Sequence, residues 1–185
     1  MRRALVVAAV AAALSATVPA TAGQASTTDP STSSSATSSA ATPKATPGDV
    51  LAGLGTLGDF GNPTAYLAAA GTSWGAPGAF TITYPDGTYA IGASTCLVVD
   101  GKVAYLTGKI ALSGGPRRTT NAWNRGSYLV VGVEDNGNGG TSETPDRLNF
   151  SPGTATDPGC GPNGMATPDF KIVRGNYRVV DGLQA

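Results

Sequence analysis

The sequence contains no histidine, two cysteines, two glutamates and twelve aromatic residues among its 185 residues. Without histidine, the chain lacks the usual general base, the usual proton shuttle and the commonest ligand of transition metals. A Ser-His-Asp relay is therefore excluded, and a thiol nucleophile would have no histidine to activate it. Paired carboxylates remain as a route to hydrolysis, but the two glutamates, Glu134 and Glu143, lie at the edges of a single loop. We expect a protein without a cofactor and without catalytic residues.

Long apolar runs are also scarce, and the one present lies at the start of the chain. Arg2 and Arg3 precede an apolar stretch over residues 4–14, which is too short to span a bilayer. A charged segment, a short apolar segment and then Ala20-Thr21-Ala22 are typical of a secretory signal peptide. We predict cleavage after Ala22, with Ala25 as the alternative, and no transmembrane segment. The arginine pair leaves both the general and the twin-arginine export routes open.

Residues 23–48 consist almost entirely of Ser, Thr, Ala and Pro. This composition buries too little apolar surface to offset the entropy of ordering, so it predicts a disordered linker. The remaining residues, 49–185, are enough for one domain with its own core. Once the signal peptide is removed, ten basic and twelve acidic residues remain, a balance that argues against a nucleic-acid partner.

The strongest fold signal is an Asp100-Gly101 turn between two apolar, β-branched runs, which predicts a β-hairpin with a type I′ turn. If Val99 pairs with Lys102, one face of the hairpin carries the better core, consisting of Leu97, Ala104, Leu106, Ile110 and Leu112. Further strand patterns recur every ten to fifteen residues, and no long helix is indicated. The pattern predicts an all-β domain, either a small antiparallel barrel or a sandwich.

Cys96 lies on the first strand of this hairpin, and Cys160 follows 64 residues later in a segment rich in Pro and Gly. Two cysteines in an exported domain are most simply a disulfide, which would remove roughly 4 kcal/mol of denatured-state freedom in the chain-entropy model. Intermolecular pairing and free thiols are the alternatives.

Several motifs between residues 79 and 182 resemble a family of uncharacterised secreted bacterial β domains that are frequent in actinomycetes. The motifs are Thr95-Cys96-Leu97-x-Val99-x-Gly101, Val133-x-Asp135-Asn136-Gly137, Pro145-Asp146 and Gly175-Asn176-Tyr177. The resemblance implies an exported β domain with a second cysteine before its last strand. It implies no catalytic residues.

Three arginines and an indole gather between two expected strands, at Arg117, Arg118, Trp123 and Arg125. Arginine and tryptophan often anchor interfaces, and arginine pairs with carboxylates, sulfates and phosphates, so these residues are a candidate contact loop for an anionic partner. In the alternative interpretation, the arginines are solvated and meet the acidic loop, while Trp123 caps the domain.

The acidic loop over residues 134–146 offers oxygen atoms that could hold Ca²⁺, but its ligands do not continue at the spacing of a calcium loop. Asp135-Asn136-Gly137 also suits an ordinary turn, so we predict a structural turn and no metal site. Together these features predict a secreted, monomeric, non-catalytic binding or structural module with an extracellular or cell-envelope partner. A small secreted hydrolase that uses carboxylates is the alternative.

Overall fold

The computed structural model describes residues 46–72, 75–137, 144–162 and 166–183. The expected signal peptide and residues 23–45 of the expected linker lie outside these ranges. Residues 46–48 form a turn that is tied to the folded domain, because the Asp49 N–H donates to the Thr46 carbonyl at 3.1 Å and the Gly48 N–H donates to the Gly71 carbonyl at 3.3 Å. In the described part of the chain, no helix has the length and apolar character needed to cross a membrane.

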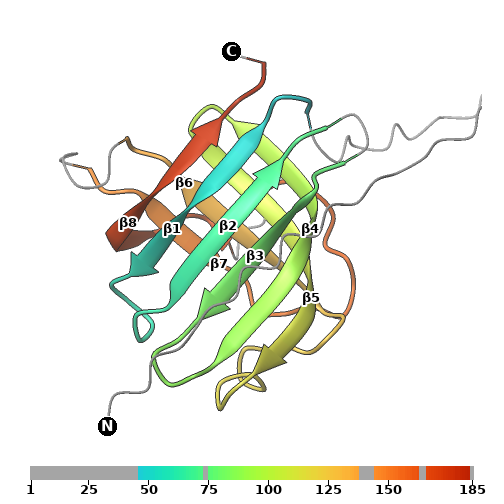
Figure 1. Cartoon of the computed structure of the whole chain (residues 1–185), viewed down its shortest axis with the longest axis vertical. Helices are drawn as coiled ribbons and strands as arrows, with labels where there is room; N and C mark the ends of the chain where they lie inside the picture. Colours follow the sequence, from blue (N-terminus) through green and yellow to red (C-terminus); the bar gives the residue numbers. More distant parts are fainter. Residues whose placement is uncertain (1–45, 73–74, 138–143, 163–165, 184–185) are drawn as a thin grey trace, which may run out of the picture. The chain divides into compact units, whose positions relative to one another are not determined.

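Eight antiparallel strands form a closed barrel in which each strand pairs with the next one along the chain and β8 pairs back with β1 (Figure 1). The strands are β1 (Val50–Leu57), β2 (Thr64–Ala70), β3 (Gly78–Thr83), β4 (Tyr89–Asp100), β5 (Val103–Gly114), β6 (Tyr128–Glu134), β7 (Arg147–Phe150) and β8 (Phe170–Val180). The prediction of a small antiparallel all-β fold closed by one disulfide is confirmed, and of the two expected architectures the structure is the barrel. Closure pairs β1 with β8, which would otherwise be the two edge strands of the sheet.

The barrel interior is filled by side chains, as expected for eight strands. Alternate residues of each strand point inward, and the largest buried side chains are Trp123, Tyr177 and Phe80. Tyr177 has no exposed surface, and its O–H donates to the Ala65 carbonyl at 2.7 Å across the interior. Burial raises the pKa of this phenol, so the group stays neutral and acts as a donor.

The β4–β5 hairpin lies where the sequence predicted it, but its register differs from the expected one. Asp100 pairs with Val103 and Leu97 with Leu106, so the two central turn residues are Gly101 and Lys102. Gly101 has a φ of 57°, whereas Lys102 is not among the residues with positive φ, which is the pattern of a type II′ turn. The pairing is shifted by two residues from the predicted one, and an even shift keeps the same side chains on the inner face.

Leu112 was expected in the core, and this expectation is wrong. The register shifts between the Gly92–Ile110 and Ile91–Leu112 pairs, which places one extra residue in β5. This bulge turns Leu112 to the outside, where 53% of its surface is exposed, while Ile110 stays buried.

The exposed Leu112 is the last member of an uncharged row that crosses the outer face of the barrel. Strand pairing aligns Leu54, Tyr66, Thr81, Ile91 and Leu112 from β1 to β5. The four large side chains of the row are each between 38% and 53% exposed. This row, which we call the outer apolar row, is a surface on which an apolar solute can adsorb.

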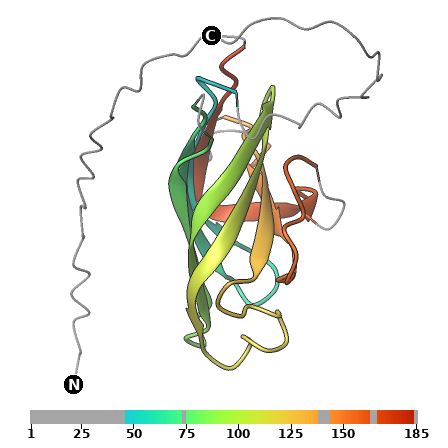
Figure 2. The same cartoon turned by 90° about the vertical axis from the view of Figure 1, so that its right-hand side faces the viewer.

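The segment between β7 and β8 runs along the outside of β5 and β6, as Figure 2 shows in orange to red. Thr107 Oγ1 donates to the Gly159 carbonyl at 2.7 Å, and the neighbouring Cys160 forms the predicted disulfide with Cys96, whose Cα lies 5.7 Å away. A Cβ on Gly132 would lie 1.9 Å from the Ala166 carbonyl oxygen, so only glycine allows this approach. Both faces of β6 are therefore buried, as its apolar sequence indicated.

Replacing Cys96 and Cys160 together with alanine should lower the free energy of unfolding by about 4 kcal/mol, because the 64-residue separation makes the closed loop long. Guanidinium unfolding monitored by circular dichroism measures this change. The reduced wild-type protein is the matched control, and it should unfold at the same denaturant concentration as the variant. Equal midpoints for oxidised wild type and variant would contradict the prediction.

Candidate functional site

A pocket of about 430 Å³ opens at the end of the barrel opposite to the end of β8. Four separate connections form it, because in an up-and-down barrel the β1–β2, β3–β4, β5–β6 and β7–β8 connections all lie at this end (Figure 1). The residues that line the pocket are Phe60, Tyr84, Thr120, Asn121, Trp123, Asn149, Phe150, Ser151, Pro152 and Phe170. Half of them are aromatic, and none carries a charge.

Trp123 is placed in the pocket by the coiled β5–β6 connection. Its backbone N–H donates to the Arg118 carbonyl at 2.9 Å, and Ser113 Oγ donates to the Trp123 carbonyl at 2.5 Å. The indole is fully buried, with its centroid 5.8 Å from the Tyr84 and Phe150 rings. Its Nε1 group has no hydrogen-bond partner, and neither has Asn121 Nδ2, although both nitrogen atoms are buried.

Two phenylalanines form one side of the pocket. The rings of Phe60 and Phe170 meet edge to face at 4.3 Å, which joins the β1–β2 connection to the start of β8. Phe60 remains 53% exposed despite this contact. Its φ of 58° is rare for a residue with a bulky side chain, so the backbone turns sharply at this position.

Arg117 lies next to the pocket and already has partners for its charge. Its Nε donates to Asp86 Oδ2 at 2.7 Å, its terminal nitrogen donates to the Phe60 carbonyl at 3.0 Å, and the guanidinium lies 4.8 Å from the Tyr84 ring centre. Burial raises the pKa of Tyr84, although the nearby Asn121 amide and the Arg117 guanidinium oppose that shift. The Asn121 amide thus lies near the phenol, but its Nδ2 makes no hydrogen bond of good geometry.

The four residues of the candidate contact loop have different environments. Arg118 and Arg125 are exposed, Arg117 is paired with Asp86, and Trp123 is buried. The indole therefore contributes to the pocket instead of to the outer surface of the loop. A contact of the arginines with an anionic partner stays a prediction.

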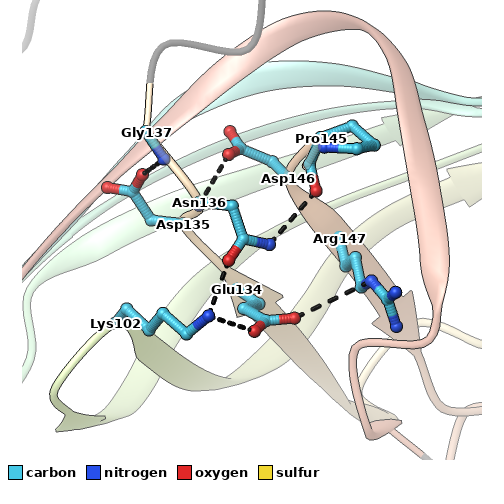
Figure 3. A network of polar contacts seen from close by, with 8 residues as sticks. All are labelled: Lys102, Glu134, Asp135, Asn136, Gly137, Pro145, Asp146 and Arg147. Atoms are coloured by element: carbon cyan, nitrogen blue, oxygen red, sulfur yellow. Dashed lines mark hydrogen bonds and ion pairs between the residues drawn. The ribbon is translucent and has the colours of Figure 1, made fainter. Parts of the chain in front are cut away.

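At the other end of the barrel, the buried carboxylate of Asp146 occupies a gap between strands. β7 pairs with β8 through only two residue pairs, so the later N–H groups of β8 have no strand beside them on that side. Asp146 Oδ2 accepts from the Tyr177 N–H at 2.8 Å. Its Oδ1 accepts from the Asn136 N–H at 2.9 Å, as Figure 3 shows. One carboxylate thereby takes the place of missing ladder acceptors and joins three segments of the barrel.

Asp135 has a similar role nearby, two residues further along β8. Its Oδ2 accepts from the Val179 N–H at 2.9 Å, and its Oδ1 accepts from the Gly137 N–H at 2.8 Å. The second bond is the local turn that Asp135-Asn136-Gly137 predicted, with Gly137 at a φ of 99°. In the ranges covered by the structure, no group of His, Cys, Asp or Glu side chains is arranged to hold a metal ion, and Glu143 lies outside those ranges.

Glu134 completes the polar network drawn in Figure 3. Lys102 Nζ lies 2.7 Å from Glu134 Oε1 and donates to Asn136 Oδ1 at 2.6 Å, while Arg147 Nε lies 3.9 Å from Glu134 Oε2. The hydrogen bond from Lys102 holds the pKa of Glu134 below its ordinary value. The acidic loop thus pairs with Lys102 and Arg147, while Arg117 at the pocket end pairs with Asp86.

The sequence analysis identified Trp123 but not the rest of the pocket. Tyr84, Asn121, Phe150 and Phe170 come from three different connections and strand ends, and no local motif marks them as neighbours. Their common signal is positional, since each lies in a connection or at a strand end at the same end of the barrel.

The chain matches no protein-family model, no curated protein and no solved structure in comparisons with each. The fold and the pocket geometry therefore carry the functional argument. They define a disulfide-linked antiparallel barrel with an uncharged aromatic pocket at one end.

Asp146→Asn should destabilise the barrel by about 1–3 kcal/mol, because an amide NH₂ would face one of the two N–H donors and leave it without an acceptor. Urea unfolding measures the change. Asp157→Asn is the control, since the exposed Asp157 accepts the local Gly159 N–H at 2.9 Å, and it should have little effect. Equal stability of the two variants would show that Asp146 does not hold the gap.

Glu134→Gln should lower the melting temperature near pH 7 by the equivalent of less than about 1 kcal/mol, because Lys102 is 58% exposed. A carboxyl pKa that is lowered in the folded state stabilises the protein above the ordinary carboxyl pKa, and this contribution is lost as the pH falls through the lowered value. The difference between wild type and variant should therefore shrink in acid, as followed by melting from pH 7 to pH 3. In a Lys102→Met background, the same substitution should change little at any pH.

Proposed function

We propose that this protein is an exported, non-catalytic binding module that holds a small, mainly apolar molecule in the aromatic pocket. The observation that carries this proposal is the pocket itself: about 430 Å³, half of its lining aromatic and none of it charged. Small-molecule sites commonly have this size and character, and the mouths of β-barrels are a recurrent place for them.

Export is supported by two independent features. The Cys96–Cys160 disulfide is of a kind that persists in oxidising compartments outside the cytoplasm. The arginine pair, the apolar segment and the Ala20-Thr21-Ala22 site at the start of the sequence favour a signal peptide. The ligand would then be met in the extracellular space or at the cell envelope, which agrees with the resemblance to secreted bacterial β domains.

The alternative, a hydrolase that uses carboxylates, has less support. None of the residues that line the pocket bears a carboxyl group. Asp135 and Asp146 lie at the opposite end of the barrel and accept backbone N–H groups with both of their oxygens. Such carboxylates are committed to the fold and are poorly placed to transfer protons to a substrate.

The neutral fluorophore N-phenyl-1-naphthylamine tests the proposal. Its fluorescence should rise saturably with one site per protein, and Thr120→Trp should abolish the rise because Thr120 is an exposed residue that lines the pocket. Thr119→Trp is the matched control, since Thr119 is the adjacent exposed residue and does not line the pocket, and it should leave binding unchanged.

Ile91→Lys separates the pocket from the outer apolar row, because it places a charge in the middle of that row. Binding that survives Ile91→Lys and is lost in Thr120→Trp supports the pocket. The absence of saturable binding, or binding that only Ile91→Lys removes, would overturn the proposal.

A further inference from the structure

Two buried hydrogen-bond donors of pocket-lining residues have no acceptor of good geometry. They are Nε1 of Trp123, whose side chain has no exposed surface, and Nδ2 of Asn121, two residues earlier in the same connection. Both residues line the pocket. Buried polar groups in folded proteins nearly always have a partner, so these two donors are the place beside the pocket where a ligand can supply an acceptor.

The chemistry of these two groups constrains the ligand. An indole N–H can only donate, and an amide NH₂ donates two hydrogens, so the ligand has to present an acceptor. A carbonyl oxygen has two lone pairs and can accept from two N–H groups at once. This favours a carbonyl over an alcohol or an amine, which would bring donors of their own.

The lack of charge in the lining also constrains the ligand. No residue that lines the pocket is charged. The nearest guanidinium, that of Arg117, is held by Asp86 Oδ2 at 2.7 Å and by the Phe60 carbonyl at 3.0 Å. An anionic ligand would lose its hydration without gaining a counter-ion, so the pocket selects against a carboxylate or a phosphate.

Five of the ten residues that line the pocket are aromatic. Trp123 lies 5.8 Å from both Tyr84 and Phe150, and Phe60 meets Phe170 at 4.3 Å. These rings pack against one another, and the surface that they turn to the pocket can offset-stack with a flat aromatic ligand or meet its edge. We infer that the pocket binds an uncharged aromatic molecule whose carbonyl oxygen accepts hydrogen bonds from Trp123 Nε1 and Asn121 Nδ2. This inference rests on the proposed function and names the ligand class for it.

Three probes of one shape test this inference: 2-acetylnaphthalene, 2-ethylnaphthalene and 2-naphthoate. Their affinities for the full chain can be measured by displacement of N-phenyl-1-naphthylamine. The ketone should bind about tenfold more tightly than the hydrocarbon, because the carbonyl satisfies donors that the hydrocarbon leaves unpaired. The carboxylate should bind at least tenfold more weakly than the ketone.

Two variants test whether the tighter binding of the ketone comes from these two donors. Trp123→Phe keeps an aromatic ring and removes the N–H, and Asn121→Leu keeps a similar shape and removes the amide. Each variant should weaken the binding of the ketone about three- to tenfold and leave the binding of the hydrocarbon unchanged. Asn124→Ala is the control, since Asn124 is exposed in the same connection and does not line the pocket. Asn121→Leu keeps the test decisive if Trp123→Phe fails to fold.

An infrared spectrum of the bound ketone gives a readout that does not depend on affinity. Its carbonyl stretch should lie below its position in hexane, and Asn121→Leu should move it some of the way back. Equal binding of ketone and hydrocarbon, or tightest binding of the carboxylate, would overturn the inference while the proposed function stands. If neither the three probes nor N-phenyl-1-naphthylamine bound, both the inference and the proposed function would be overturned.

Discussion

The closed barrel depends on the buried carboxylate of Asp146. β7 has four residues and pairs with β8 through two of them, so a ladder of backbone hydrogen bonds alone would leave the seam open. Asp146 and Asp135 supply acceptors for the Tyr177 and Val179 N–H groups at this place. Once the seam is held there, Tyr177 lies in the interior and its O–H reaches Ala65 on β2. The buried carboxylate of Asp146 thus compensates for the shortness of β7.

The two ends of the barrel therefore differ in their chemistry. At one end, the carboxylates of Asp49, Asp135, Asp146 and Asp181 accept N–H groups of the backbone and tie the connections down. At the other end, the connections carry aromatic rings and leave space between them. Carboxylates thus hold the backbone at one end of the barrel, whereas the other end contains the aromatic cavity of about 430 Å³.

Strand positions and the disulfide could be predicted from the sequence because alternation, turn residues and two cysteines are local or countable signals. The closure of the barrel could not be predicted, since the pairing of the first and last strands leaves no local signal in the sequence. In β1 the three-residue spacing of Leu51, Leu54 and Leu57 does not identify a strand, although Leu51 and Leu57 face inward with a period of two and Leu54 is 51% exposed. Leu112 was misplaced because a bulge in β5 reverses its side, and no residue type marks that bulge. The pocket escaped prediction because its lining is assembled from four distant connections.

A ring of strands has no privileged starting point, and here the two ends of the ring touch. A Cβ on Gly48 would lie 3.1 Å from Gly182 Cα, and the Asp49 carboxylate accepts the Gly182 N–H at 3.1 Å. The barrel is therefore suited to circular permutation: a short peptide could join these ends, and the chain could be reopened between Gly101 and Lys102. Every strand would keep both of its neighbours, and the new termini would leave the barrel at the end remote from the pocket. The point at which the chain starts could thus be moved, whereas the order of the strands around the barrel is fixed by the residues that pair.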